Sequence, residues 1–165
     1  MKLLSMNTAI YSCIRLEELA AEFSIGRGDV ILTNRYILSG AALDAMSGAS
    51  VIWKEDYGKG EPTDVMVNAI RAECPRDAKR IIALGGGTVM DVAKLLVLPL
   101  DRPLESFLAP DAEFIREREL ILVPTTCGTG SEMTNISIIT FTGIHFKGGI
   151  VSDTLYADAA VLIPQ

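Results

Sequence analysis

The sequence predicts an α/β protein with a Rossmann-like parallel sheet flanked by helices and a β-hairpin near the C-terminus. Short runs of branched apolar residues, bounded by glycine and polar residues, alternate with helical segments. This alternation is typical of βαβ units, whose parallel sheet is covered on both faces. The chain has 165 residues, 49% of them apolar, which suffices for one domain with a sizeable core.

The expected elements follow from local patterns in the chain. Five runs rich in Val, Ile and Leu are expected to be buried strands: 29–33, 49–54, 79–84, 120–124 and 159–163. Four segments have helical patterning: 16–23, 35–47, 63–73 and 88–98. Thr63 is expected to cap the third of these helices. Residues 135–152 contain two β runs joined near Thr142 and Gly143, which predicts the hairpin.

Composition excludes several classes of protein. The net charge of −6 and the pI near 4.8 argue against a nucleic-acid-binding protein, which needs a basic face. The chain has no run of eighteen apolar residues, and its N-terminus lacks the apolar core of a signal peptide, so we expect no membrane association. Three scattered cysteines without C-x-x-C spacing indicate a reducing compartment. Together these features predict a cytoplasmic protein.

The stretch "ALGGGTVMDVAK", residues 83–94, is the first of two motifs with chemical meaning. Its glycines leave a predicted strand and lead directly into a helix. Because glycine has no Cβ, a ligand can approach this backbone closely, and the first amides of the helix suit a phosphate. The motif is neither a G-x-G-x-x-G fingerprint nor a Walker loop. The alternative is an ordinary turn, with Asp91 stabilising the first turn of the helix.

The second motif is "PTTCGTGSEMT", residues 124–134, which places five hydroxyl residues and two glycines at the end of a predicted strand. Both motifs are expected at the same carboxyl edge of the sheet, where open α/β sheets bind their ligands. The alternative is a turn whose hydroxyls cap a following helix, with "SEMT" in a capping box. Taken together, the two loops favour a nucleotide site.

These two motifs, in this order, resemble those of the iron-containing alcohol dehydrogenase family. That family holds a nicotinamide dinucleotide with a GGGS-x-x-D-x-x-K loop and a PTT-x-GTGSE-x-T loop, so residues 1–165 are expected to form a single dinucleotide-binding domain. Within the family, "LTNRYI", "YGKGEP" and "SDTLYADAAVLIP" look most like the 4-hydroxybutyrate dehydrogenases, which interconvert 4-hydroxybutyrate and succinate semialdehyde. The resemblance implies an NAD-dependent oxidoreductase acting on a small alcohol or aldehyde.

The resemblance assigns the first motif to the middle and the nicotinamide end of the cofactor. Gly86, Gly87 and Thr88 match the pyrophosphate-binding loop of the family, with Thr88 where serine is commoner. Asp91 matches an acid near the nicotinamide. No residue of this chain is matched to a catalytic role.

Further cofactor-binding residues are implied in the same way. Thr125, Thr126 and Thr129 match hydroxyls that line the dinucleotide. Lys147 matches a lysine near the cofactor ribose and phosphates, the alternative being a solvated hairpin lysine. Asn34 stands where many members carry an aspartate that binds the adenosine ribose, and its alternative is a plain turn residue. An aspartate would repel the 2′-phosphate of NADP but Asn34 would not, so NAD is expected and NADP stays open.

The metal site of the family has no counterpart in this sequence. Members bind Fe²⁺ or another divalent metal through one aspartate and three histidines, the first two in a D-x-x-x-H helix. This chain has one histidine, His145, and no such motif, so His145 is expected to be a surface residue. In the family the ligands lie in an all-helical second domain that follows this point. We therefore expect an N-terminal half that is inactive alone, from an enzyme that is a homodimer or larger.

Three other functions stay open at this stage. The chain is alternatively a stand-alone nucleotide-binding module without catalysis, or part of a dehydrogenase in the same family that acts on another primary alcohol. Sugar-phosphate lyases such as dehydroquinate synthase resemble the family in architecture, but "PTTCGTGSE" looks like the alcohol dehydrogenase version of the loop.

Overall fold

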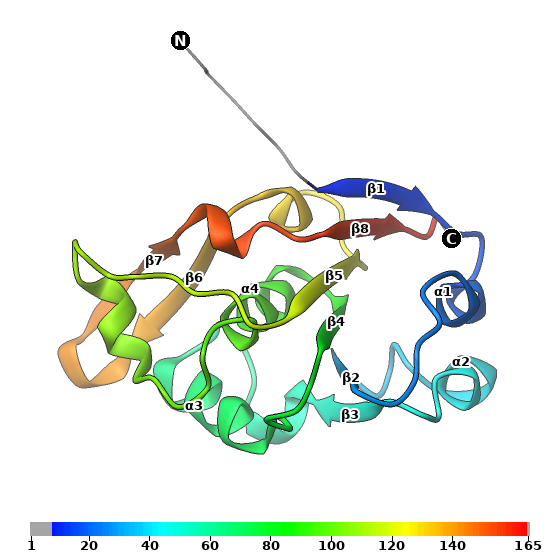
Figure 1. Ribbon diagram of the computed structural model, residues 1–165, viewed down its shortest axis with the longest axis horizontal. Helices are drawn as coiled ribbons and strands as arrows, with labels where there is room; N and C mark the ends of the chain where they lie inside the picture. The colour runs from blue at the N-terminus through cyan, green and yellow to red at the C-terminus, as the bar shows by residue number, and fades with distance from the viewer. Residues whose placement is uncertain (1–7, 165) are drawn as a thin grey trace, which may run out of the picture.

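A six-stranded parallel sheet forms the centre of the structure, a computed structural model that describes residues 8–164 (Figure 1). Its strands lie in the order β1-β8-β5-β4-β2-β3. Their bounds are β1 (Ala9–Ser12), β2 (Asp29–Thr33), β3 (Ser50–Trp53), β4 (Arg80–Gly85), β5 (Glu119–Pro124) and β8 (Ala159–Leu162). A separate antiparallel pair consists of β6 (Ile136–Phe141) and β7 (Phe146–Val151). The predicted fold class is therefore confirmed.

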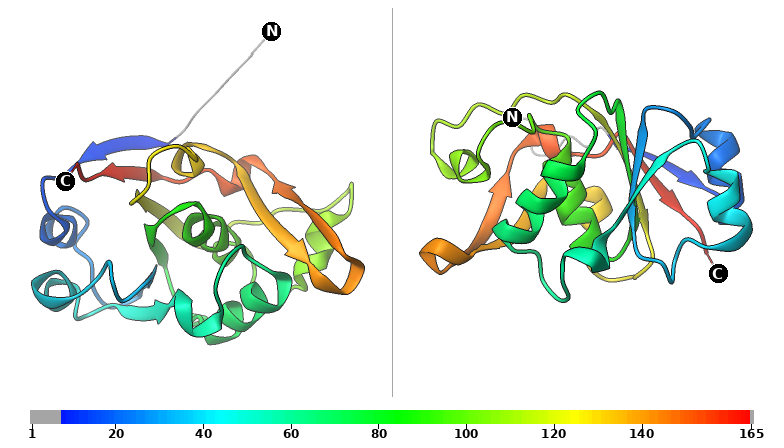
Figure 2. Two further views of the ribbon diagram at one scale, coloured as in Figure 1. Left: turned by 180° about the vertical axis from the view of Figure 1, so that it is seen from behind. Right: turned by 90° about the horizontal axis from the view of Figure 1, so that it is seen from below.

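Helices cover the two faces of the sheet. α1 (Leu16–Glu22) and α2 (Gly40–Ala45) lie on one face, and α3 (Asp64–Glu73) and α4 (Gly87–Leu96) lie on the other (Figure 2). Within residues 8–164, no helix combines the length and apolarity that a membrane crossing requires. Residues 1–7, part of the stretch in which no signal peptide is predicted, lie outside the described residues.

Alternate side chains of the central strands enter two separate apolar cores, because successive residues of a strand point to opposite faces. Val30, Ile81 and Leu120 belong to the core with α3 and α4. Ile31 and Ile82 belong to the core with α1 and α2. These five side chains are at most 1% exposed, as expected for strands that are continuous apolar runs in the sequence. The sheet is thus a rigid platform for the loops at its edge.

The helix boundaries agree with the sequence except at α2. Thr63 caps α3 as predicted, since its Oγ1 accepts a hydrogen bond from the Met66 amide at 3.2 Å. The helix predicted for residues 35–47 is wrong over its first five residues. There the carbonyl of Asn34 accepts hydrogen bonds from the Ile37 and Leu38 amides, which form a turn that delays α2 to Gly40.

The sheet differs from the prediction at its edges. The sequence did not predict β1, which pairs in parallel with β8. All four β1 side chains are exposed, including Ile10 at 62%, and β3 is only partly buried. The expectation of burial on both faces therefore holds for the inner strands and is wrong for β3. Within residues 8–164, β1 and β3 each have a neighbouring strand on one side only.

The β6–β7 hairpin confirms the prediction for residues 135–152 and packs on α4 instead of extending the sheet. Ile139, Phe141 and Ile150 are buried in the core that contains α4. On the outer side of β6, the Thr140 amide donates to the Pro62 carbonyl at 2.9 Å. The hairpin thereby brings residues 136–147 beside the start of α4, which positions them for the site.

The far end of α4 is held by two buried arginines. Arg118 Nη1 donates to the Leu98 carbonyl at 3.1 Å, and Arg71 Nη2 donates to the Arg102 carbonyl at 2.8 Å. Arg71 and Arg118 are 4% and 5% exposed. Their charges lie at the negative end of the helix dipole and satisfy carbonyls near the end of the helix. α4 is therefore fixed at its C-terminal end.

The packing of α4 on β4 gives a first testable prediction. A Cβ added to Gly85 would lie 2.6 Å from Val89 Cγ2, and Val89 is buried and stiff in χ1. We expect Gly85→Ala to destabilise the protein by about 1–3 kcal/mol, measured by urea unfolding. Gly143→Ala, where nothing lies within 4 Å of the added Cβ, is the matched control. Equal stability of the two variants would contradict the prediction.

Candidate functional site

The two glycine-rich loops meet at the carboxyl edge of the sheet, as the sequence predicts. β4 and β5 are parallel neighbours, with Gly85 paired to Pro124, so both loops leave the sheet at the same level. A Cβ added to Gly86 would lie 3.2 Å from Thr126 Oγ1, and one added to Gly87 would lie 3.1 Å from Thr129 Cγ2. The two loops therefore pack closely at these glycines, where a Cβ would require the threonine side chains to shift.

The start of α4 offers backbone amides to a ligand. Gly86 is the N-cap residue, and no side chain caps the helix there. The Gly86 carbonyl accepts from the Val89 and Met90 amides, whereas the amides of Gly87 and Thr88 have no carbonyl one turn earlier to bond. Together with the helix dipole, such amides favour an anion such as a phosphate.

A cleft of about 320 Å³ lies beside this helix start. We call it the first cleft. It brings together five of the predicted residues: Gly87, Thr88, Asp91, Thr129 and Lys147. Residues that the sequence reasoning did not assign also line it, among them Glu61, Ser131, Thr134 and Ile138. The first cleft thus combines the helix start, the second glycine-rich loop and the hairpin.

A second cleft of about 930 Å³ lies on the other side of the second glycine-rich loop. It is lined by Thr125 and Thr126, and by Tyr36 from the turn after β2. Asn34 is not among the lining residues of either cleft. It lies after the end of β2, 8% exposed, and its Nδ2 donates to the Tyr36 hydroxyl at 3.4 Å. The predicted residues are therefore divided between two clefts, except for Gly86 and Asn34, which line neither.

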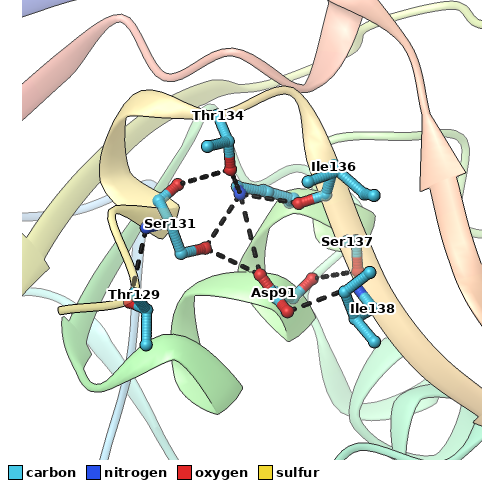
Figure 3. A network of polar contacts seen from close by, with 8 residues as sticks. Asp91, Thr129, Ser131, Thr134, Ile136, Ser137 and Ile138 are labelled. Carbon is cyan, nitrogen blue, oxygen red and sulfur yellow. Dashed lines mark hydrogen bonds and ion pairs between the residues drawn. The ribbon is translucent and has the colours of Figure 1, made fainter.

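Asp91 does not have the role that the alternative gave it, which was to stabilise the first turn of the helix. Because α4 begins at Gly87, Asp91 is the fifth helical residue and not an acid of the first turn. Its Oδ1 accepts from Ser131 Oγ at 2.7 Å and its Oδ2 from the Ile138 amide at 3.2 Å (Figure 3). Its own carbonyl accepts from Ser137 Oγ at 2.7 Å. Asp91 therefore joins α4 to both the loop and the hairpin.

Lys94, three residues further along α4, is the centre of the same network and was not singled out from the sequence. It is fully buried, and its Nζ donates to Ser131 Oγ at 2.9 Å, to Thr134 Oγ1 at 3.0 Å and to the Ile136 carbonyl at 2.7 Å. Burial lowers the pKa of Lys94 to about 8, and the carboxylate of Asp91, 3.6 Å away, opposes this shift. Lys94 is the last residue of the motif "GGGTVMDVAK", which was the available sequence signal for its role.

The capping-box part of the alternative for the second loop is wrong, whereas its turn is present, because the Thr129 hydroxyl accepts from the Ser131 amide at 3.4 Å. Ser131 begins a short 3₁₀ segment, Ser131–Met133, whose N-cap is Gly130 and which has no side-chain cap. The Ser131 hydroxyl bonds to Asp91 and Lys94 instead. The loop is therefore attached to α4.

Lys147 forms an ion pair at the mouth of the first cleft. Its Nζ lies 2.7 and 2.6 Å from the two carboxylate oxygens of Glu61, with both side chains more than half exposed. The loop before Glu61 is held by Lys54, whose buried Nζ donates to the Gly58 and Gly60 carbonyls at 3.0 and 3.2 Å. Lys147 is thus exposed, as expected if it is a solvated hairpin lysine, and it also lines the first cleft.

No metal-binding group is formed by the described part of the chain. Residues 8–164 contain no cluster of three or more His, Cys, Asp or Glu side chains that could hold a metal ion. His145 is exposed and lies in the hairpin turn with a φ of 49°, which confirms its prediction as a surface residue. The donors present here therefore do not fit a divalent metal site.

Comparison with known proteins identifies the family. The family model described as "Iron-containing alcohol dehydrogenase" matches residues 9–164. The chain belongs to this family. The proteins it resembles include the 4-hydroxybutyrate dehydrogenase of Clostridium kluyveri, 42% identical over 166 residues that cover all of this chain and 45% of that protein. The sulfoacetaldehyde reductase of Bilophila wadsworthia is 32% identical over 126 residues, 72% of this chain and 32% of that protein.

A solved structure of similar fold is the sulfoacetaldehyde reductase from Bifidobacterium kashiwanohense in complex with NAD⁺. It matches with a TM-score of 0.81 and 22% identity, over 97% of this chain and 45% of that one. This chain therefore spans less than half the length of these three proteins.

The buried ammonium gives a prediction on pH. In the unfolded chain Lys94 titrates near 10.5, whereas in the folded protein it titrates near 8. Between these two pH values the unfolded state binds more protons than the folded state. The free energy of unfolding therefore rises with pH, by at most about 1.4 kcal/mol per pH unit. We expect the unfolding free energy of the wild type, relative to Lys94→Met, to increase from pH 8 to pH 10 in urea titrations. A difference independent of pH would contradict the lowered pKa.

Proposed function

We propose that the chain is the cofactor-binding part of a metal-dependent alcohol dehydrogenase that uses NAD. The observation that supports this most directly is the meeting of two glycine-rich loops at the free amides of α4, beside a cleft. Such an arrangement suits a phosphate at the edge of a parallel sheet. Membership of the family and the NAD⁺ in a protein of the same fold support the same cofactor.

The proposed placement runs along the edge of the sheet. Gly86, Gly87 and Thr88 would hold the pyrophosphate with their amides, since these are the unpaired donors at the start of α4. The first cleft would receive the nicotinamide end, with Asp91 and Thr129 on its wall. Its volume of about 320 Å³ lies within the usual range of small-ligand sites.

The adenosine end would then lie on the side of the second cleft. Thr125 and Thr126 offer hydroxyls there, and both are exposed. Asn34 would reach the adenosine ribose next to Tyr36, to which it is hydrogen-bonded. Lys147, at the mouth of the first cleft, would supply a positive charge to the ribose and phosphates. These assignments use every predicted residue.

The bound nicotinamide would accept a hydride from the alcohol carbon, and the residues of this chain would bind and orient it. Because residues 8–164 do not fit a divalent metal, the Fe²⁺ or other ion of the family would be held outside them, and the chain alone would be inactive. Identity of 42% to a 4-hydroxybutyrate dehydrogenase supports 4-hydroxybutyrate and succinate semialdehyde as the substrate pair. The whole enzyme would be a cytoplasmic homodimer or larger oligomer.

The second candidate is a nucleotide-binding module without catalysis, which the lack of a metal cluster in the described residues favours. The intact mass of the native polypeptide in its source cells separates the two. A mass about twice that of this chain supports the dehydrogenase, in line with relatives of which it covers less than half. A mass equal to 17.8 kDa supports the module.

NAD⁺ binding is the direct test of this function. We expect the 165-residue chain to bind NAD⁺ in isothermal titration calorimetry. Lys147→Met should weaken binding about tenfold, because it removes a charge from the cleft, and the difference should shrink at high salt. Lys59→Met, at an exposed lysine that lines neither cleft, is the control and should bind normally. Absence of NAD⁺ binding by the wild type would refute the function.

The choice between NAD and NADP depends on Asn34. We expect Asn34→Asp to weaken NADP⁺ binding about tenfold or more while leaving NAD⁺ binding within about threefold, because the carboxylate repels a 2′-phosphate. Parallel titrations with NAD⁺ and NADP⁺ measure the ratio of the two dissociation constants. An unchanged ratio would show that Asn34 does not face the adenosine ribose.

A further inference from the structure

Ser131 is the point at which the buried polar network of α4 reaches the second glycine-rich loop. We propose that Ser131, held by Asp91 and Lys94, is a positioning residue that fixes this loop against Gly87 and so keeps the nucleotide site formed. Neither Ser131 nor Lys94 was among the predicted cofactor-binding residues. The inference rests on the proposed function for the identity of the ligand, and on the contacts of residues 87–137 for the positioning itself.

The hydroxyl of Ser131 is fully engaged within the protein. Its one proton is donated to Asp91 Oδ1 at 2.7 Å, and its oxygen accepts from Lys94 Nζ at 2.9 Å (Figure 3). The residue is 6% exposed although it borders the first cleft. A serine hydroxyl has a single donor, so Ser131 has no proton left for a ligand. Its influence on a ligand must therefore act through its neighbours.

Those neighbours lead from Ser131 to the start of α4. The Ser131 amide donates to Thr129 Oγ1 at 3.4 Å. Thr129 in turn packs on Gly87, where a Cβ would lie 3.1 Å from Thr129 Cγ2. Gly87 carries one of the free amides of the proposed phosphate site. The contacts thus form a continuous path from the buried Lys94 to the ligand-facing backbone.

The loop between β5 and Ser131 needs such an anchor because its backbone is permissive. Gly128 and Gly130 have φ values of 125° and 62°, in the left-handed region, and a Cβ added to either would meet nothing within 4 Å. Glycine loses more conformational freedom on ordering than other residues. Residues 125–129 are exposed. Ser131 is the first buried residue after them, so it sets where the loop ends.

The anchor is separable from the fold, which makes it testable. Lys94 keeps two further acceptors, Thr134 Oγ1 and the Ile136 carbonyl, when the Ser131 hydroxyl is removed. Ser137 offers a matched control, since its hydroxyl is also buried and donates to the carbonyl of Asp91 at 2.7 Å. Ser137 lies on β6, outside the loop. Ser131→Ala and Ser137→Ala thus each remove a buried hydrogen bond to Asp91, and Ser131→Ala also removes the hydrogen bond from Lys94.

The experiment compares these two variants with the wild-type chain by two measurements. Calorimetry with NAD⁺ should show binding weakened about tenfold in Ser131→Ala and changed less than about twofold in Ser137→Ala. Hydrogen exchange without any ligand should show faster exchange of the amides of residues 127–131 in Ser131→Ala only. Urea unfolding shows whether both variants are folded and measures the stability that each of them loses.

Each outcome has a distinct meaning. Unchanged exchange of the loop amides in Ser131→Ala would overturn the positioning role, whatever the binding result. Equal loss of NAD⁺ affinity in both variants would also overturn it, because the effect would then come from general loss of packing. If the loop amides respond as expected but the wild type does not bind NAD⁺, the positioning role stands and the proposed ligand fails.

Discussion

The buried ammonium of Lys94 is the constraint on which the site depends. A charge without solvent contact must be met by hydrogen-bond acceptors, because leaving it unpaired costs several kcal/mol. Here the acceptors come from the second loop and from the first residue of β6, and Asp91 adds a neighbouring negative charge. Neither the loop nor the hairpin can leave α4 without stranding this charge. One helix therefore offers its end to a ligand and holds the loops around it.

The C-terminal end of α4 is likewise held by buried charged side chains. Arg71 and Arg118 satisfy carbonyls beyond its C-terminus and are themselves buried. The positively charged side chains of α4 and of its surroundings thus lie along the buried part of the helix and at its C-terminal end, where the helix dipole is negative. The N-terminal end, with its free amides, carries no side-chain cap. A helix fixed in this way at one end and open at the other keeps its ligand-binding amides in a constant position relative to the sheet.

The sequence predicted the elements whose signals are local. The apolar runs of β2, β4, β5 and β8, the Thr63 cap and the two glycine-rich loops all carry their information within a few residues. β1 was not predictable because its four exposed side chains give no apolar run and its partner β8 lies 150 residues later in register. The Glu61–Lys147 pair, 86 residues apart, and the partners of Lys94 likewise depend on contacts that no local pattern records.

The pairing of β1 with β8 also affects how the chain becomes folded during synthesis. β4 and β5, with both glycine-rich loops, follow β2 and β3 closely, so this part of the sheet can pair as it leaves the ribosome. Among the described strands β1 is synthesised before the others, yet its strand partner among them is β8, the last of these. It therefore has no partner among them until β8 has been synthesised. The first of the described strands to be synthesised is thus the last to become paired.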